Sequence, residues 1–197
     1  MALTPSEANT ALDICSRALI LIGAEPISSF DDGSTEALVC VNLYEDVVRT
    51  ALTNTRWRFA TNQKVLNRLT DIPTGRFNFA YQIPQDNLMV HAVTVNDNLI
   101  EYQIYGDKIY SNTSENDEVI SDYSFRASEL DFPSYFTLAV QFSLSVILAT
   151  SIARDASLAQ LMTVRADGAM AKARSLDSQQ QTTRRLETNR FITARQS

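Results

Sequence analysis

The only histidine of the 197-residue chain, His91, lies in the apolar run LMVHAVTV, whose composition indicates a β-strand. A histidine-dependent catalytic site would have to use this residue as its general acid or base. A histidine within a strand is, however, more typical of a partly buried residue that packs in a sheet. We therefore interpret His91 as structural.

No motif for nucleotide binding or nucleophilic catalysis is present. The five glycines, at 23, 33, 75, 106 and 168, form neither G-x-G-x-x-G nor a phosphate-binding loop, and G-x-S-x-G and H-E-x-x-H are absent. Asp31 and Asp32 lack the ligand spacing of a calcium loop, and we interpret them as charges before a helix capped by Ser34. The sequence therefore predicts no catalytic residues, no metal site and no cofactor. Carboxylates paired only by folding would not be visible in the sequence, so a hydrolase remains an alternative.

A second distinctive stretch is TALTNTRWRFATN at residues 50–62, where the only tryptophan, Trp57, lies between Arg56 and Arg58. As a binding site, it would stack a base on the indole and hold a phosphate with the arginines. As a structural joint, Trp57 and Phe59 would be the first inward-facing residues of a sheet and would lock it onto the helices, while the arginines face water. We favour the joint, because one aromatic residue between two charged ones also fits strand alternation.

Four helical patterns surround this stretch. The first follows a capping box at Thr4-Pro5-Ser6-Glu7 and ends at Gly23, and the second ends near Asn54. The third is the uncharged run 134–153, which contains Gln141, four serines and two threonines and is therefore a poor membrane span and a good buried helix. The fourth would be roughly 45 Å long if it continued to residue 188. The residues expected to face the core of the second and fourth helices are Leu38, Val41, Tyr44, Val48 and Leu52, and Leu158, Leu161, Met162, Met170, Ala173 and Leu176.

Between the second and third helices the apolar period changes to two. The alternation begins at Trp57 and Phe59, returns over residues 77–83, and ends in VISDYSF at residues 119–125. Two turns are expected, at Asn96-Asp97 and at Gly106-Asp107. These residues predict one small antiparallel sheet.

The predicted fold is α+β, a four-helix bundle with a small antiparallel β-sheet inserted between helices 2 and 3, and a long C-terminal helix and tail. Residues 1–55 and 130–178 would form the bundle, residues 56–129 the β-rich insert, and residues 179–197 a C-terminal extension.

The net charge of −6 is distributed unevenly along the chain. Residues 1–177 carry 13 Lys+Arg against 22 Asp+Glu, whereas residues 178–197 carry four arginines against one glutamate. An acidic body argues against general nucleic-acid binding, which needs a clustered basic face. Cys15 and Cys40 lie far apart in apolar helical stretches, and we expect two buried free thiols.

The chain resembles the tail tubular protein A family, the head-to-tail adaptors of short-tailed phages, over nearly its whole length. The resemblance is carried by ALILIGAEPISSFDD, ALVCVNLYEDVVRTALTNTRWRFAT, YSFRASELDFPSYFTLAVQFSLSVILAT and the closing FITARQS, in that order and spacing. It implies a virion protein of the tail, present in the host cytoplasm during assembly, that forms a ring of typically twelve copies between the portal and the tail nozzle. DNA would pass through this ring without specific binding, and tail fibres would attach to it in some relatives.

The basic tail is expected to bind the portal or the next subunit. Phe191 and Ile192 would fill pockets there, and carboxylates would pair with Arg184, Arg185, Arg190 and Arg195. The turns at Asn96, Asp97, Gly106 and Asp107 would face the nozzle or the fibres. The rival classes are a virion-associated hydrolase of the cell wall, and a DNA-binding assembly factor that acts through Arg56, Arg58 and the tail.

Overall fold

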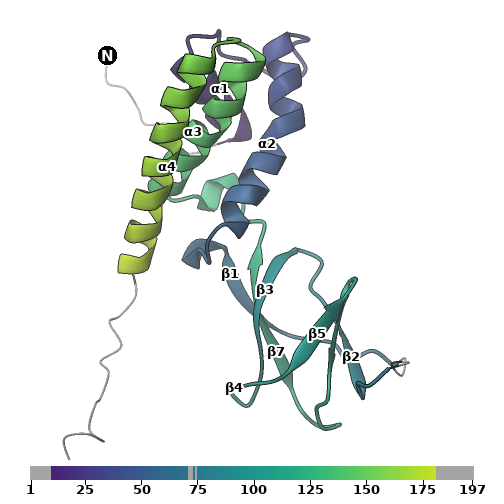
Figure 1. The fold of residues 1–197 in the computed structure, drawn as a ribbon. Helices are drawn as coiled ribbons and strands as arrows, with labels where there is room; N and C mark the ends of the chain where they lie inside the picture. The colour runs from purple at the N-terminus through teal and green to yellow at the C-terminus, as the bar shows by residue number, and fades with distance from the viewer. Residues whose placement is uncertain (1–9, 71–72, 74, 181–197) are drawn as a thin grey trace, which may run out of the picture.

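The computed structural model describes residues 10–70, 73 and 75–180. Helices occupy one end of the molecule and antiparallel strands the other, and the strands form an insert within the helical sequence (Figure 1). The Thr4 capping box and the tail residues from 181 onward lie outside the described residues.

Four α-helices form the helical part: α1 Ala11–Leu21, α2 Thr35–Thr53, α3 Ser134–Ser151 and α4 Ala156–Gln179. Three begin at polar caps, since Thr10 accepts from the Asp13 amide, Ser34 from the Ala37 amide, and Asp155 from the amides of residues 157 and 158. The Ser34 cap and the end of α2 at Asn54 are as predicted. The described helix α1 has a capping box of its own at Thr10 and Asp13.

Helix α3 is the common partner of the other three. It packs against α1, α2 and above all α4, and α4 has no comparable contact with α1 or α2. The helices and antiparallel strands of the predicted α+β fold are thus confirmed, but a closed four-helix bundle is not, because α4 is an edge helix. Among the described residues, α3 alone is long and apolar enough to cross a membrane, and half of it is buried inside the protein, as in a core helix.

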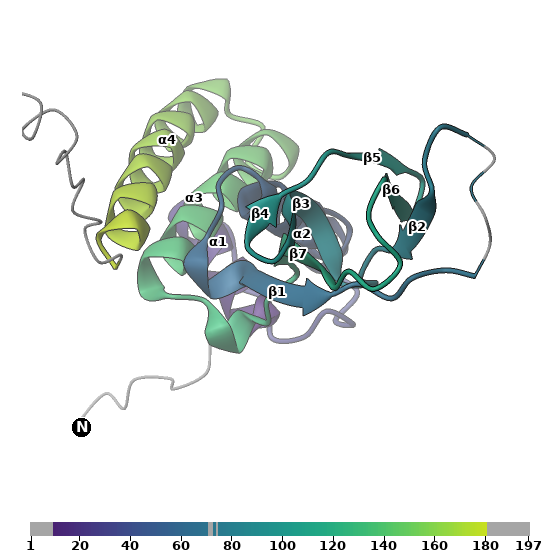
Figure 2. The same ribbon diagram turned by 90° about the horizontal axis from the view of Figure 1, so that it is seen from below.

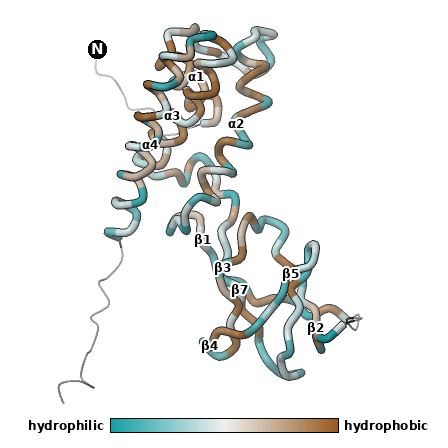
Figure 3. Tube along the Cα trace, viewed as in Figure 1, coloured by the Kyte–Doolittle hydropathy of each residue, from teal (hydrophilic) through white to brown (hydrophobic). Residues whose placement is uncertain are grey.

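The helical core follows the predicted apolar stripes only in part. Hydrophobic residues recur along α1, α2 and α3 (Figure 3), and Tyr44, Val48 and Leu52 are buried as expected. Three residues expected inside are exposed instead, namely Leu38, Val41 and Leu161. The prediction was wrong for these three because no described element covers the outer sides of α2 and α4 at those levels. Cys15 and Cys40 are buried free thiols, as predicted.

The strands form two sheets, where the sequence predicted one. The first has the order β1-β7-β3-β4 and the second β2-β6-β5, all pairs antiparallel. The bounds are β1 Thr61–Val65, β2 Phe79–Gln82, β3 Asn87–Val95, β4 Asn98–Leu99, β5 Tyr102–Tyr105, β6 Lys108–Ser111 and β7 Val119–Phe125. Leu66, Tyr81, Ile83, Val93, Ile109 and Val119 form a second hydrophobic cluster that joins the sheets.

The last strand and both turns lie where they were predicted. Strand β7 covers VISDYSF, and Asn96 and Asp97 connect β3 to β4 with positive φ angles of 49° and 62°, which short polar residues tolerate in a tight hairpin. Gly106, at φ 61°, begins the turn between β5 and β6. The strand expected at Trp57 and Phe59 is wrong, because Arg58–Ala60 form a 3-10 turn and β1 starts only at Thr61. Seen from below, β1 leaves the helices directly after this turn (Figure 2).

Candidate assembly interface

An aromatic cluster lies where the chain leaves α2 for the sheets. Trp57 is fully buried in the helical core, and its indole nitrogen donates to the carbonyl of Ala51 at 2.8 Å. The rings of Trp57 and Phe59 both pack edge-on against Phe136 of α3, with centroids 5.0 Å and 4.9 Å away. Such edge-to-face contacts add to the hydrophobic gain of burial. A buried indole is closed to a nucleic-acid base, so the stacking interpretation of this stretch is wrong.

The segment between α2 and β1 also binds the last turn of α4, through Arg58. The Arg58 amide donates to the Asp177 carboxylate at 3.3 Å, and Arg58 Nε donates to the Asp177 carbonyl at 2.9 Å. The Tyr135 hydroxyl donates to the same carboxylate at 3.0 Å. Burial, together with this bond to Asp177, raises the pKa of Tyr135 to about 12. Arg58 thus holds the end of α4, while its side chain is also partly exposed to water, as predicted.

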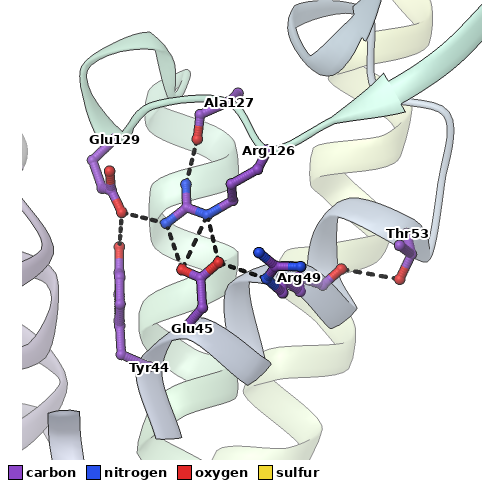
Figure 4. Close-up of polar contacts among 7 residues, drawn as sticks. All are labelled: Tyr44, Glu45, Arg49, Thr53, Arg126, Ala127 and Glu129. Atoms are coloured by element: carbon purple, nitrogen blue, oxygen red, sulfur yellow. Dashed lines mark hydrogen bonds and ion pairs between the residues drawn. The ribbon is translucent and has the colours of Figure 1, made fainter. Parts of the chain in front are cut away.

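A second polar network joins α2 to the segment that leaves the sheets (Figure 4). Arg126, directly after β7, donates through Nη2 to Glu45 at 2.9 Å and to Glu129 at 2.5 Å, and it also donates to the carbonyl of Ala127. Tyr44 donates to Glu129 at 3.1 Å, and Arg49 donates to Glu45 at 2.7 Å. We call Glu45, Arg126 and Glu129 the Arg126 clamp. It fixes the return of the chain from the sheets against α2.

The clamp favours the ionised form of Glu45. Burial raises the pKa of this carboxyl, but hydrogen bonds from Arg126 and Arg49 outweigh burial and hold the pKa below its ordinary value of 4.5. The charged form of Arg126 is favoured as well, because Glu45 and Glu129 raise the pKa of its guanidinium against the opposing effect of burial. Glu45 and Arg126 are therefore both charged throughout the neutral range.

His91 belongs to the first sheet and pairs with a buried serine. It lies at an irregularity of the β3–β7 ladder, and its Nε2 is 2.7 Å from Ser124 Oγ. Burial and then the nearby Arg56 lower the pKa of His91, which Asp122 only partly offsets. Ser124 is fully buried, so a substrate cannot reach its hydroxyl. The geometry gives a packed, neutral histidine, as the sequence analysis interpreted it, and no usable nucleophile.

Arg56 is also engaged within the chain. Its Nη2 lies 2.9 Å from Asp122 on β7, so its charge is compensated by a neighbouring carboxylate. The described residues contain no group of three or more His, Cys, Asp or Glu arranged to hold a metal ion. Arg56 and Arg58 together therefore do not form the free basic face that phosphate binding requires.

An apolar groove of about 330 Å³ lies between α2 and α4, and residues of α3 also line it. Leu43, Val47, Ile147 and Met170 are among its apolar lining residues. Asp46, Asp167 and Arg174 also line it. The groove exists because α4 packs on α3 without closing against α2.

The remaining predicted site residues divide into two groups. Asn96, Asp97, Gly106 and Asp107 are exposed turn residues of the sheet part. The other group, Arg184, Arg185, Arg190, Phe191, Ile192 and Arg195, lies outside the described residues, so the structure does not locate it.

The sequence analysis missed the two polar networks. Asp177 carried a detectable signal, because it continues the buried α4 spacing of Ala166, Met170 and Ala173 and an acid at such a position needs a partner. The Arg126 clamp carried none, since Glu45 and Arg126 are 81 positions apart and both occur among other charged residues.

Comparison with known proteins identifies the family to which this arrangement of helices and sheets belongs. A family model described as Tail tubular protein matches residues 12–133, which run from α1 through both sheets to the start of α3. A search of curated proteins finds no match. Because the family model covers more than half of the 197 residues, the chain belongs to the tail tubular protein family.

Proposed function

We propose that this phage tail structural protein forms the adaptor ring between the portal and the tail nozzle, with about twelve copies around a passage for DNA. The observation that carries the proposal is the fixed connection between the helical and sheet parts. The aromatic cluster, the Arg58–Asp177 contact and the Arg126 clamp act on both crossings of the chain between the two parts. A ring wall that binds one partner at each end needs such a constant orientation, and membership of a tail protein family supports a place in the virion tail.

The two ends of the subunit are assigned to different partners. The sequence of the tail, with Phe191 and Ile192 among four arginines, suits docking on the portal or the adjacent copy through apolar pockets rimmed by carboxylates. The exposed turns at Asn96-Asp97 and Gly106-Asp107 suit contact with the nozzle or with fibres. Trp57 and Phe59 serve as the joint that keeps these ends in register. The ring would assemble in the host cytoplasm before the virion is complete.

The charge of the chain suits a passage that does not retain DNA. Twelve copies of a chain with a net charge of −6 carry about −72 in total. A lumen lined by uncompensated arginines would instead bind the phosphates and slow the DNA. Arg56 and Arg58 are both held by carboxylates, which supports the passage over a DNA-binding factor.

The test is direct imaging of the purified chain mixed with its own portal protein, with the portal alone as the control. We expect an additional ring stacked on the portal in electron micrographs, with a subunit count given by its rotational symmetry. A portal that stays unchanged at saturating concentrations of the chain would overturn the adaptor role. Release of peptidoglycan fragments by the pure chain would favour the hydrolase alternative instead.

A further inference from the structure

The outer face of α4 carries an apolar stripe that nothing in the described chain covers. Leu161 and Val164 are 47% and 72% exposed, and Gly168 follows four residues after Val164 on the same face. The opposite face, with Ala159, Met162 and Ala166 among its residues, is the one that packs on α3. We call Leu161, Val164, Arg165 and Gly168 the α4 stripe. Two exposed aliphatic residues side by side on an edge helix make this face a candidate contact surface.

Gly168 supplies an independent observation about this stripe. A glycine inside a helix costs about 1 kcal/mol relative to alanine. A Cβ added at Gly168 would meet no atom within 4 Å beyond its chain neighbours and the adjacent backbone of its own helix, so the packing of the described chain gives no reason for glycine at this position. Close approach of a second backbone to the stripe is a physical reason for it.

A hollow with apolar lining residues, which suits the apolar α4 stripe, lies at the start of α2. It measures about 320 Å³ and is lined by Phe30, Asp31, Gly33, Ser34, Leu38 and Val41. Leu38 and Val41 are 64% and 51% exposed. We call this the α2 hollow. Leu38, Val41 and Leu161 are the three residues that helical periodicity placed in the core and that are exposed instead, so each is of core type but is left uncovered by the described chain.

The two surfaces are complementary in charge. The α4 stripe carries Arg165 and the α2 hollow carries Asp31, and within the described part of the chain neither forms an ion pair. Helices α2 and α4 form two edges of the helical part, and the first turns of both lie at the end remote from the sheets (Figure 1). The surfaces are therefore at a similar level and cannot meet within one copy.

We infer that the α4 stripe of one copy docks in the α2 hollow of the next copy. Leu161 and Val164 enter the hollow against Phe30, Leu38 and Val41, and Arg165 pairs with Asp31 at its rim. Because the two surfaces differ, the contact is head-to-tail, and repetition of a head-to-tail contact closes a ring when its rotation allows. The inference rests on the proposed ring and names the surfaces that build it.

Cysteine pairing tests this contact in the full-length chain. A Leu38→Cys chain and a Val164→Cys chain are mixed in equal amounts with the portal and oxidised gently, while Cys15 and Cys40 stay buried. The matched control replaces Leu38→Cys by Leu130→Cys, at a 68% exposed leucine outside both surfaces. We expect disulfide-linked pairs in the first mixture to form at least about tenfold faster than in the control, because docking raises the effective thiol concentration.

The outcomes separate the two proposals. Cross-linking no faster than the control overturns the inference, and rings seen on the portal in the same sample would leave the adaptor role standing. Faster cross-linking of Val164→Cys with itself would show a two-fold contact and would also overturn the inference. Absence of rings on the portal counts against the adaptor role independently.

Charge reversal gives a second readout. Arg165→Glu and Asp31→Arg should each weaken association between copies about tenfold, the loss expected for one interfacial ion pair turned repulsive. The double variant restores the pair with exchanged signs, and we expect it to recover most of the affinity in analytical ultracentrifugation. A double variant as weak as the product of the two single effects would overturn the pairing of Arg165 with Asp31.

Discussion

Arg58 and Asp177 connect the first residues after α2 to the last turn of α4, although 119 positions separate them in the sequence. Arg58 supplies two donors to this contact, its amide and its Nε, and Asp177 receives them with both its carboxylate and its carbonyl oxygen. The contact holds the last turn of α4 against the segment that follows α2.

Replacing Asp177 should therefore loosen the end of α4. Asp177→Ala leaves the Arg58 amide and the Tyr135 hydroxyl without their acceptor, and we expect a loss of about 1–3 kcal/mol in the free energy of unfolding. Urea denaturation measures the loss, and hydrogen exchange should rise first in the last turn of α4. Asp167→Ala, at an exposed position of the same helix, is the control and should have little effect. Equal stability of the two variants would contradict this role of Asp177.

The aromatic cluster should respond to the size of the side chain at position 57. Trp57→Ala removes a fully buried indole and should cost about 3–5 kcal/mol. Trp57→Phe keeps a ring against Phe136 but loses the bond to the Ala51 carbonyl, and should cost about 1–2 kcal/mol. Thermal unfolding followed by circular dichroism ranks the two. If Trp57→Ala were the milder change, Trp57 would not be a core residue.

The Arg126 clamp predicts a dependence of stability on pH. A carboxylate whose pKa is lower in the folded chain stabilises it above the unfolded pKa, and this contribution is lost as the pH falls through the folded pKa. The stability difference between the natural chain and Glu45→Gln should thus be constant at neutral pH and shrink below about pH 4.5. Urea titrations at several pH values measure this difference, and a difference that grows on acidification would contradict the clamp.

Removing the central cation of the clamp should cost more than removing its outer partner. Arg126→Met leaves Glu45 and Glu129 facing each other without compensation, and should lower the free energy of unfolding by about 1–2 kcal/mol. Arg49→Met removes only an exposed pair with Glu45 and should cost less than about 0.5 kcal/mol. Denaturation at neutral pH, at low and high salt, compares them.

The C-terminal extension should be needed for docking and dispensable for folding. Deleting residues 184–197 should leave the melting curve of the purified chain nearly unchanged and abolish co-sedimentation with the portal. Within the full chain, Phe191→Ala with Ile192→Ala should weaken docking, whereas Thr193→Ala should not. Undiminished docking by the truncated chain would refute this assignment.

Local signals in the sequence were enough to locate several elements. Helix α2 begins after Ser34 and ends at Asn54, and both ends were predictable because capping depends on local residues. The turn at Asn96-Asp97 was predictable because positive φ angles select such residues. The pairing of strands into two sheets depended on contacts between distant segments, such as Tyr81 with Ile109, which no local pattern encodes.

The candidate surfaces, too, could be predicted from the sequence only in part. Periodicity recognised Leu38, Val41 and Leu161 as residues of core type, but it carries no information about which neighbour covers them. The Arg126 clamp and the Arg58–Asp177 contact were invisible for a related reason, since ion pairs across 81 and 119 positions arise only from the folded arrangement.

The sheets are inserted between α2 and α3, so the backbone crosses from the helices to the strands twice. The two crossings continue as β1 and β7, which are hydrogen-bonded neighbours, with Thr61 opposite Ser124. A force applied at the far tip of the strands would therefore be shared by two covalent strands that lie side by side. Their hydrogen-bonded pairing would let both strands resist separation of the sheets from the helices.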